Sequence, residues 1–234
     1  PFVALITKQL EVIALHGQLS VRADEMTRLM QIVQNDFQTP VKELKGIASL
    51  LSARYSKSLA GESREYLRQV LFDLGAIEKL ISGLEDYQNL DQFVEMQEID
   101  AKKIMLAAWA QVKKRALEHG IRASFPEKCP AVLFHPKAFF YIFSHLFSNA
   151  VRAVMDSDDP IIEVGVVNRP KKIEFFVRDN GIGVPISMQD RIFDLFYKER
   201  KNNDGGAGLG LAIAKKAVLA HGGQIWLIPG GNGA

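Results

Sequence analysis

Three polar residues share one face of an expected helix within the stretch HLFSNAVRA, residues 145–153. His145, Asn149 and Arg152 stand at positions i, i+4 and i+7, which fall on one side of an α-helix. An amide oxygen can ligate a hard divalent cation and a guanidinium can neutralise phosphate, so this face suits a magnesium-triphosphate group. The alternative is that the three side chains form the ordinary polar face of a half-buried helix.

A second candidate is the stretch RDNGIGVP, residues 178–185, which follows the apolar run KIEFFV. Gly181 and Gly183 permit a positive φ and a close approach of a ligand to the backbone. Asp179, at the end of the expected strand, can accept a hydrogen bond from an amino group such as that of adenine. The alternative is a tight turn with a solvated aspartate.

Glycines also precede an amphipathic helix in GGAGLGLAIAKKAVLAHGG, residues 205–223. Backbone N–H groups there can face a phosphate, whereas the alternative is a flexible linker followed by a helix cap. The pattern is neither G-x-x-x-x-G-K-[ST] nor a G-x-G-x-x-G that follows a strand. The preceding RIFDLFYKERKNNDGG begins apolar and becomes charged and glycine-rich, which is typical of a mobile lid over a nucleotide.

Two regions of different periodicity must position these stretches. From Phe2 to Leu51 apolar residues recur at a 3–4 spacing, and a second such pattern runs from Leu67 to Leu84 after the turn-rich YSKSLAGES. Two long amphipathic helices joined by a short loop form an antiparallel hairpin. Its apolar stripe stays exposed unless it meets another hairpin, so we expect a dimeric four-helix bundle.

After about residue 90 the pattern changes to helices interleaved with short strands, which predicts an α/β sandwich and an α+β chain overall. Helices are expected in AKKIMLAAWAQVKKRALEHG, closed by Gly120, and in AFFYIFSHLFSNAVRAVM. Strands are expected in IRASF, IIEVGVV, KIEFFVRD and GGQIWLI.

Composition excludes several functional classes. Lys+Arg 29 against Asp+Glu 27 gives a net charge of +2 without an arginine-rich tract, so neither nucleic acid nor a membrane surface is an expected partner. The single Cys129 excludes an intrachain disulfide and fits a reducing compartment, the cytoplasm. The chain has no apolar run of membrane-spanning length and begins at Pro1 without Met. We expect a cytoplasmic fragment of a longer protein, whose parent can still be membrane-anchored.

The ordered set HLFSNAVRA, DNGIGV, IFDLFY and GAGLGLAIAKKAVLAHGG resembles the N, G1, F and G2 boxes of the Bergerat-type ATP-binding domain of sensor histidine kinases. The resemblance covers about residues 95–234 and implies ATP and Mg²⁺ as cofactors. It implies that Asn149 is the magnesium ligand and Asp179 the adenine reader. The implied nucleotide-binding set also contains Arg152, Gly181, Gly183, Lys198, Gly206, Gly208, Leu209 and Gly210.

Two departures from this family concern its nucleotide site. Most members have Asn where this chain has His145, but the chemotaxis kinases are similar in having His, which implies a catalytic role beside the γ-phosphate. DNA gyrases and related chaperones place a Glu base there, so its absence argues against a dedicated ATPase. The family often has an aromatic residue after Arg152, and Ala153 cannot line an adenine in that way.

The helical half resembles the dimerisation and phosphotransfer domain of the same kinases over residues 22–90, with residues 1–21 similar to a signalling coiled-coil helix from an upstream sensor. The family signature is a phosphoacceptor His, an acidic residue, two variable residues, Thr or Asn, and Pro. In this chain it reads Asn35, Asp36, Phe37, Gln38, Thr39 and Pro40. The heptad independently places Asn35 and Thr39 off the buried seam, and Pro40 predicts a bend after them.

The residue at the acceptor position decides what chemistry is expected. The family transfers the γ-phosphate of ATP to a bundle His and then to an Asp of a response-regulator receiver domain. That transfer needs an unprotonated ring nitrogen, with a carboxylate such as Asp36 to orient it, and the nitrogen lone pair of Asn35 is delocalised. We therefore predict that the chain binds Mg-ATP as a homodimer without autophosphorylating. The alternatives are a non-phosphorylating signalling module, or a response-regulator phosphatase that uses Asp36 and Thr39.

Overall fold

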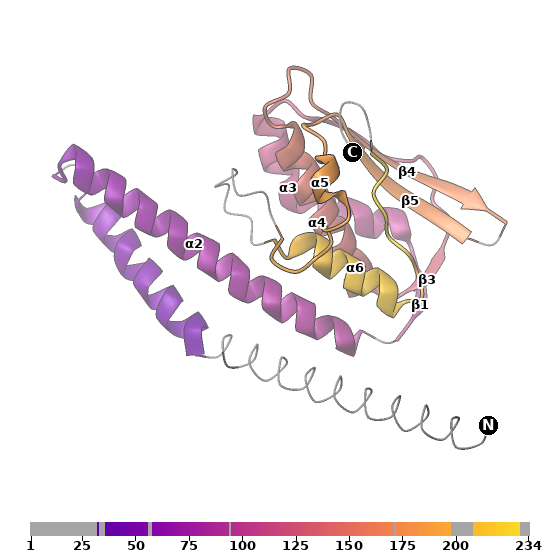
Figure 1. Cartoon of the computed structure of the whole chain (residues 1–234), viewed down its shortest axis with the longest axis horizontal. Helices are drawn as coiled ribbons and strands as arrows, with labels where there is room; N and C mark the ends of the chain where they lie inside the picture. Colours follow the sequence, from indigo (N-terminus) through magenta and orange to yellow (C-terminus); the bar gives the residue numbers. More distant parts are fainter. Residues whose placement is uncertain are drawn as a thin grey trace, which may run out of the picture. The chain divides into compact units, whose positions relative to one another are not determined.

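The computed structural model describes residues 32, 36–55, 58–93, 95–170, 172–197 and 208–229 (Figure 1). The chain divides into a hairpin unit, Pro1–Glu85, and a sandwich unit, Asp86–Ala234. Three residues predicted for the site, Asn35, Lys198 and Gly206, lie outside the described residues. The predicted signalling helix and most of the predicted lid lie outside them as well.

Two helices form the described part of the hairpin unit, as the periodicity predicts. Residues 36–55 are helical, and the helix continues through Pro40. After a turn, α2 runs from Gly61 to Asn89 and so extends past the division between the units. The core between the two helices consists of Val41, Ala48, Leu74 and Ile81. A hydrogen bond from Gln38 Nε2 to Glu85 Oε1 (3.1 Å) and an ion pair between Lys45 and Glu78 flank this core.

The residues of the predicted heptad seam do not form the contact between the two helices of one hairpin. Phe37 and Leu44, at successive a positions, are 55% and 55% exposed, whereas Val41 and Ala48 are 6% and 5% exposed. Val41 and Ala48 occupy e positions, so the e residues face α2 and the a residues face outward. An apolar stripe therefore remains exposed on the hairpin, as expected for a helix pair that is not packed against a second helix pair.

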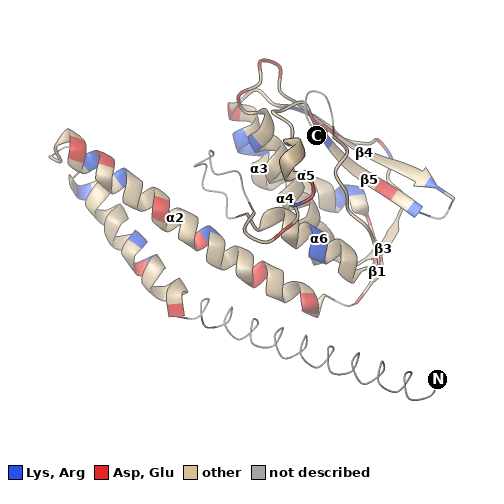
Figure 2. Ribbon diagram, in the orientation of Figure 1, with Lys and Arg blue, Asp and Glu red and all other residues tan. Residues whose placement is uncertain are grey.

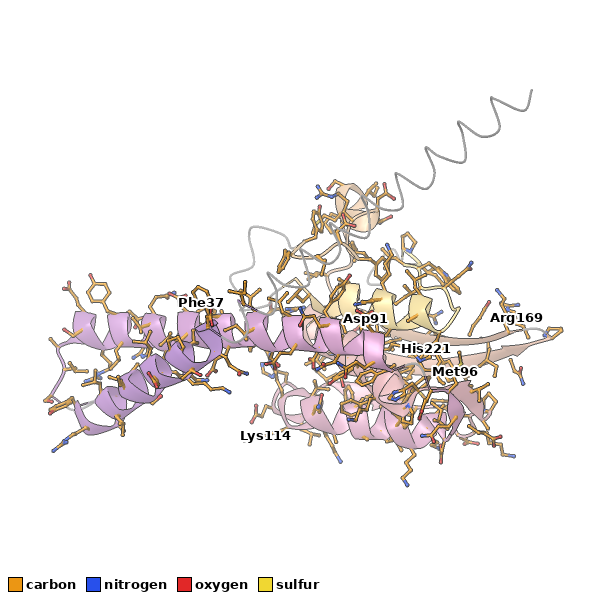
Figure 3. The ribbon with its side chains drawn as sticks, turned by 90° about the horizontal axis from the view of Figure 1, so that it is seen from below. Phe37, Asp91, Met96, Lys114, Arg169 and His221 are labelled. Carbon is orange, nitrogen blue, oxygen red and sulfur yellow. The ribbon has the colours of Figure 1, made fainter. Side chains whose placement is uncertain are left out.

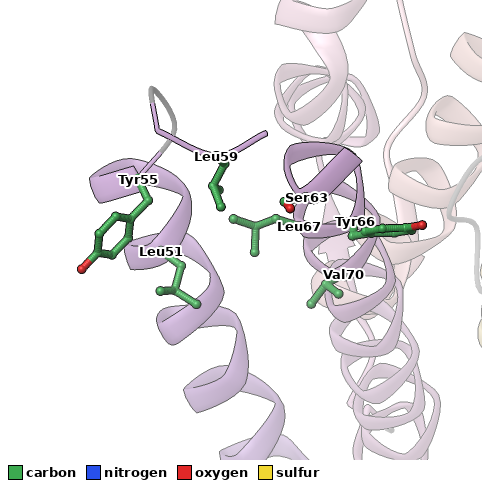
Figure 4. A pocket seen from close by; sticks show the side chains of 7 residues that line it. All are labelled: Leu51, Tyr55, Leu59, Ser63, Tyr66, Leu67 and Val70. Atoms are coloured by element: carbon green, nitrogen blue, oxygen red, sulfur yellow. The ribbon is translucent and has the colours of Figure 1, made fainter. Parts of the chain in front are cut away.

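A hollow of about 370 Å³ lies near the turn of the hairpin, and Leu51 of the stripe lines it (Figure 4). Figure 4 shows Leu51 and Tyr55 on the first helix and Tyr66, Leu67 and Val70 on α2 at either side of it. Tyr66 is 71% exposed. Large apolar and aromatic side chains thus line an open surface, where a packing partner would bury them.

The sandwich unit confirms the predicted mixed architecture. A three-stranded sheet has the order β2-β4-β5, with β2 parallel to β4 and β4 antiparallel to β5, and β1 pairs with β3 in a separate antiparallel ribbon. Helix α4 contacts α3, α6 and the sheet, so it lies at the centre of the unit (Figure 1). In chain order the elements are η1 (Leu90–Gln92), β1 (Gln97–Ile99), α3 (Ala101–Glu118), β2 (Arg122–Ser124), β3 (Val132–Phe134), α4 (Pro136–Val154), β4 (Ile161–Arg169), β5 (Lys172–Asp179), α5 (Ile186–Gln189) and α6 (Gly210–Ala220).

Local sequence explains the two long helices of this unit. Asp100 caps α3 by accepting a hydrogen bond from the Lys103 N–H (3.0 Å), and Gly120, at φ 66°, follows its end as predicted. Helix α4 starts at Pro136, which suits a first turn. Its Phe139, Phe143 and Phe147, spaced by four residues, are 4%, 2% and 0% exposed. This aromatic face anchors α4 and fixes its opposite, polar face.

Two strands were missed by the sequence prediction, and one predicted strand is wrong. The sequence did not predict β1 or β3, which are too short for a period-two pattern to show. The stretch GGQIWLI was predicted as a strand, but residues 222–228 are irregular. The centroid of the Trp226 ring lies 5.9 Å from Nζ of Lys172, at the start of β5, yet the described sheet ends at β5. The apolar run was misleading because Trp226 and Ile228 are 53% and 67% exposed, so apolar character does not mark a buried strand here.

Charge is distributed evenly over the described residues. Figure 2 shows basic and acidic residues interspersed along α2 and over the sandwich unit. Among the described helices, none is long and apolar enough to cross a membrane.

Candidate functional site

The C-terminal part of α4 carries the first predicted pair. The Arg152 guanidinium donates a hydrogen bond to Asn149 Oδ1, one turn before it on the same face. The bond orients the amide so that its oxygen lies beside a permanent positive charge. Because an amide oxygen has two lone pairs, Asn149 Oδ1 can accept this bond and still offer the other lone pair to a cation.

Asp179 is fixed by the turn that follows β5. Its Oδ1 accepts a hydrogen bond from the Gly181 N–H (3.0 Å), and the Ile182 N–H donates to the Ala153 carbonyl (3.2 Å). A Cβ on Gly181 would lie 2.3 Å from the Ala153 carbonyl oxygen, so only glycine allows this turn to contact the end of α4. The turn that holds Asp179 therefore lies against the end of α4, the helix that carries Asn149 and Arg152.

Asn180 was missed by the sequence reasoning, although it holds the same turn in place. Its Oδ1 accepts from the Ile161 N–H (2.8 Å) and its Nδ2 donates to the Asp159 carbonyl (2.7 Å). The end of β5 is thereby tied to the start of β4. The available signal was an Asn just before a glycine at a strand end, where an amide can both donate and accept.

The start of α6 is connected to residues 191–197, the described part of the predicted lid. Gly208 has φ 69°, and its carbonyl accepts a hydrogen bond from the Phe196 N–H (2.9 Å). A Cβ on Gly208 would lie 2.8 Å from the Phe196 carbonyl carbon. Phe196 itself has φ 62°, which is rare for an aromatic residue, and no sequence pattern indicates it.

The first turn of α6 suits an anion. Leu209, 2% exposed, precedes the helix and has no polar atom with which to cap it. The first N–H groups of a helix lack partners within the helix, and the helix dipole favours negative charge there. The buried leucine fixes the position of this helix end in the sandwich unit.

His145 lies beneath the same helix end. A Cβ on Gly210 would lie 3.1 Å from His145 Nδ1, so the imidazole of α4 packs directly against the start of α6. Its Nε2 is buried and has no hydrogen-bond partner among the described residues. Burial lowers the pKa of His145 to about 4, so its ring is neutral at physiological pH.

The neutral, buried His145 predicts a specific acid sensitivity. Its pKa is about 4 in the folded chain against 6.5 when exposed, so the unfolded state binds the proton first and stability falls as pH drops below 6.5. Protonation of His145 in the unfolded state alone lowers the free energy of unfolding by about 2 kcal/mol between about pH 7 and pH 5.

Urea unfolding of the chain and of His145→Asn at several pH values isolates this contribution, because the other titrating groups are shared. We expect the unfolding free energy of the variant to fall less, by that amount, over the same pH interval. Parallel curves for the two proteins would contradict the assignment.

Helix α4 brings most of the predicted residues together. Asn149 and Arg152 lie on it, the turn bearing Asp179 and Gly181 contacts its Ala153, and the start of α6 contacts its His145. Gly183 lies in the same turn with φ 70°. Asp36 and Thr39 belong to the hairpin unit, where both are exposed.

Comparison with known proteins agrees with this arrangement. Residues 135–233 match the model of the histidine kinase-, DNA gyrase B- and HSP90-like ATPase family. The chain is 28% identical over 228 residues to the phytochrome-like protein Cph1 of Synechocystis sp., covering 96% of this chain and 30% of that protein. It is 28% identical over 219 residues to the methanogenesis regulatory histidine kinase FilI of Methanothrix harundinacea, covering 90% and 24%. The chain thus spans less than a third of the length of these relatives.

Solved structures show the same fold. Full-length ShkA in complex with AMPPNP superposes with a TM-score of 0.60 at 22% identity, covering 83% of this chain and 41% of that one. Histidine kinase ThkA in complex with the response regulator TrrA gives 0.61 at 17% identity, covering 93% and 61%. Residues 135–233, which contain α4, β5 and α6, thus carry a domain of the histidine kinase-, DNA gyrase B- and HSP90-like ATPase family, and together with the histidine kinase relatives this match supports a sensor histidine kinase.

Proposed function

We propose that the sandwich unit binds Mg-ATP on the face formed by the end of α4, the turn after β5 and the start of α6. The contact of Gly181 with Ala153 carries this proposal, because it brings an acceptor carboxylate, Asp179, to the helix that bears Asn149 and Arg152. In this arrangement Asp179 accepts from the adenine amino group. The N-terminus of α6 and Arg152 face the phosphates.

The residues present fit a magnesium ion that arrives with its nucleotide. Mg²⁺ keeps several waters and is commonly held by one or two protein oxygens together with substrate phosphates. Asn149 Oδ1 supplies one such oxygen. Arg152 orients that oxygen and offsets phosphate charge, and Mg²⁺ would neutralise the remaining negative charge of the triphosphate.

Nucleotide binding is tested by thermal denaturation of the unmodified chain with and without Mg-ATP. A ligand that binds only the folded state raises its apparent stability, so the midpoint of unfolding should rise with nucleotide concentration. No rise at millimolar Mg-ATP would contradict the proposed pocket.

We further propose that the whole chain is the catalytic core of a sensor histidine kinase in which autophosphorylation is blocked. Residues 22–90 act as the dimerisation and phosphotransfer domain, residues 95–234 as the ATP-binding domain, and residues 1–21 as a signalling helix. Asn35, at the acceptor position, has no nucleophilic nitrogen. His145, held against the start of α6, acts near the γ-phosphate.

The hairpin unit assembles with a second copy of itself in this proposal. Its uncovered a positions and the hollow near the turn present the apolar surface that a four-helix bundle would bury. Leu44 and Ile47, on this stripe, are 55% and 57% exposed.

Charge placed on this stripe should prevent dimerisation. We expect Leu44→Lys/Ile47→Lys to shift the chain from dimer to monomer in sedimentation velocity, with at least a hundredfold weaker association, because burying two ammonium groups is costly. Leu133→Lys is the matched control, since Leu133 is a 65% exposed apolar residue of β3 in the sandwich unit. A dimer that survives the double substitution, or a monomeric unmodified chain, would contradict this interface.

Exposure of Asp36 and Thr39 on one helix favours a second activity, the dephosphorylation of a response-regulator receiver domain. The Thr39 hydroxyl would orient water toward the phosphoaspartate while Asp36 contacts the regulator. If so, the chain accelerates loss of phosphate from its receiver domain, and Thr39→Ala slows this at least tenfold, whereas Thr39→Ser retains it. Equal rates with and without the chain would exclude the activity.

A further inference from the structure

Lys216 joins α6 to the end of α2. Its Nζ donates hydrogen bonds to the Tyr87 carbonyl oxygen (2.9 Å) and to Asp91 Oδ2 (2.8 Å), and it lies 4.2 Å from the centroid of the Tyr87 ring. The Lys216 side chain is 22% exposed, so these contacts are partly shielded from water. Asp91 lies where α2 leads into η1, beside α6 (Figure 3). All three residues belong to the sandwich unit.

This contact supplies what α2 lacks. The last carbonyl groups of a helix have no partner within it, and a cation near them is favourable. Helix α2 has no basic residue in its last turn, and Glu85 and Asp86 precede Tyr87. The ammonium group that satisfies the Tyr87 carbonyl therefore comes from a helix distant in the sequence.

Apolar contacts hold the adjoining segment to the same unit. Leu90 is 1% exposed, and η1 packs against α6. Phe93 stacks on the His135 ring, at the start of α4, with 4.6 Å between centroids. The segment from Tyr87 to Phe93 is thus docked on both α6 and α4, and Lys216 is its polar contact.

We propose that Lys216 is a positioning residue that clamps the end of α2 to α6 and makes the order of this junction depend on the nucleotide. Gly210, in the first turn of α6, precedes Lys216 by about 9 Å along the helix axis. Phosphate bound at that first turn would order it, and the rigid α6 would pass this restraint through Lys216 to the end of α2. The clamp itself rests on the contacts above, and its dependence on nucleotide rests on the proposed function.

Hydrogen–deuterium exchange of the full chain without nucleotide tests the clamp. We expect the peptide covering residues 86–93 to exchange at least about tenfold faster in Lys216→Met, which keeps the alkyl stem and removes the charge. Lys216→Arg should retain most of the protection, and Asp91→Asn should give an intermediate rate.

Lys215→Met is the matched control, because Lys215 is the exposed neighbour on the same helix. It should leave exchange of this peptide unchanged. Unaltered protection in both Lys216→Met and Asp91→Asn, or an equal acceleration in Lys215→Met, would overturn the clamp.

The same measurement with saturating Mg-AMPPNP tests the dependence on nucleotide. We expect the nucleotide to slow exchange of residues 86–93 at least threefold in the unmodified chain but not in Lys216→Met, while it still raises the unfolding temperature of both. Equal nucleotide protection in the two proteins would refute the coupling. If the nucleotide raises neither unfolding temperature, the proposed function fails, whereas the nucleotide-free comparison still decides the clamp.

Discussion

Asp179→Asn is expected to weaken Mg-ATP binding at least a hundredfold, which corresponds to about 2.7 kcal/mol. The carboxylate presents only acceptor atoms to the adenine amino group. An asparagine held by its Oδ1 to the Gly181 N–H would present its NH₂ to that amino group instead, so a favourable contact becomes a donor–donor contact. Calorimetric titration with Mg-AMPPNP measures the loss.

The fold should survive this substitution, because the amide oxygen of the introduced asparagine can still accept from the Gly181 N–H. The unfolding temperature without nucleotide checks this. Asp190→Asn is a matched control, since Asp190 is an exposed aspartate just after α5, and it should bind normally. An affinity of Asp179→Asn within about threefold of the unmodified chain would remove Asp179 from the site.

Asn35→His is expected to convert a chain without detectable autophosphorylation into one that accepts the γ-phosphate of ATP. The change restores an imidazole nitrogen lone pair at the acceptor position. Asp36, the neighbouring carboxylate, is exposed and can orient the new ring. Label from γ-labelled ATP should accumulate on the protein in an acid-labile form.

Two further variants locate the source of that label. Asn35→Gln retains an amide and should stay unlabelled, and Asn35→His/Asp179→Asn should lose the gain because it binds little nucleotide. If Asn35→His still binds Mg-ATP but takes up no label, the result would favour the non-phosphorylating signalling module. Equal labelling of the double variant would show that the phosphate does not come through the proposed pocket.

The sequence predicted those parts of the sandwich unit that local signals determine. Strand β5, Lys172–Asp179, begins and ends where the apolar run and the glycine turn place it, and Gly120 correctly marks the end of α3. The resemblance to the ATP-binding domain rests on short glycine and asparagine motifs. Steric constraints at some of these positions admit only one residue type. Gly181 shows one of them, because no side chain fits between it and Ala153.

Features that depend on distant partners could not be predicted. The heptad identifies an apolar stripe but not which of its positions meets the second helix, so Val41 and Ala48 are buried while Phe37 and Leu44 remain exposed. GGQIWLI ends in an apolar run typical of a strand but is paired with none of the described strands. Lys216 bonds to Tyr87 across 129 positions of the chain, and no local pattern indicates such a contact.

The unmodified chain, equilibrated with γ-labelled Mg-ATP, tests the central claim most directly. We predict that label is retained by the native protein, because the ATP site is intact. We also predict that all of it is released when the protein is denatured, because Asn35 forms no phosphoryl bond. Label that is never retained would contradict the nucleotide site, and acid-labile label that stays on the denatured chain would contradict the blocked acceptor.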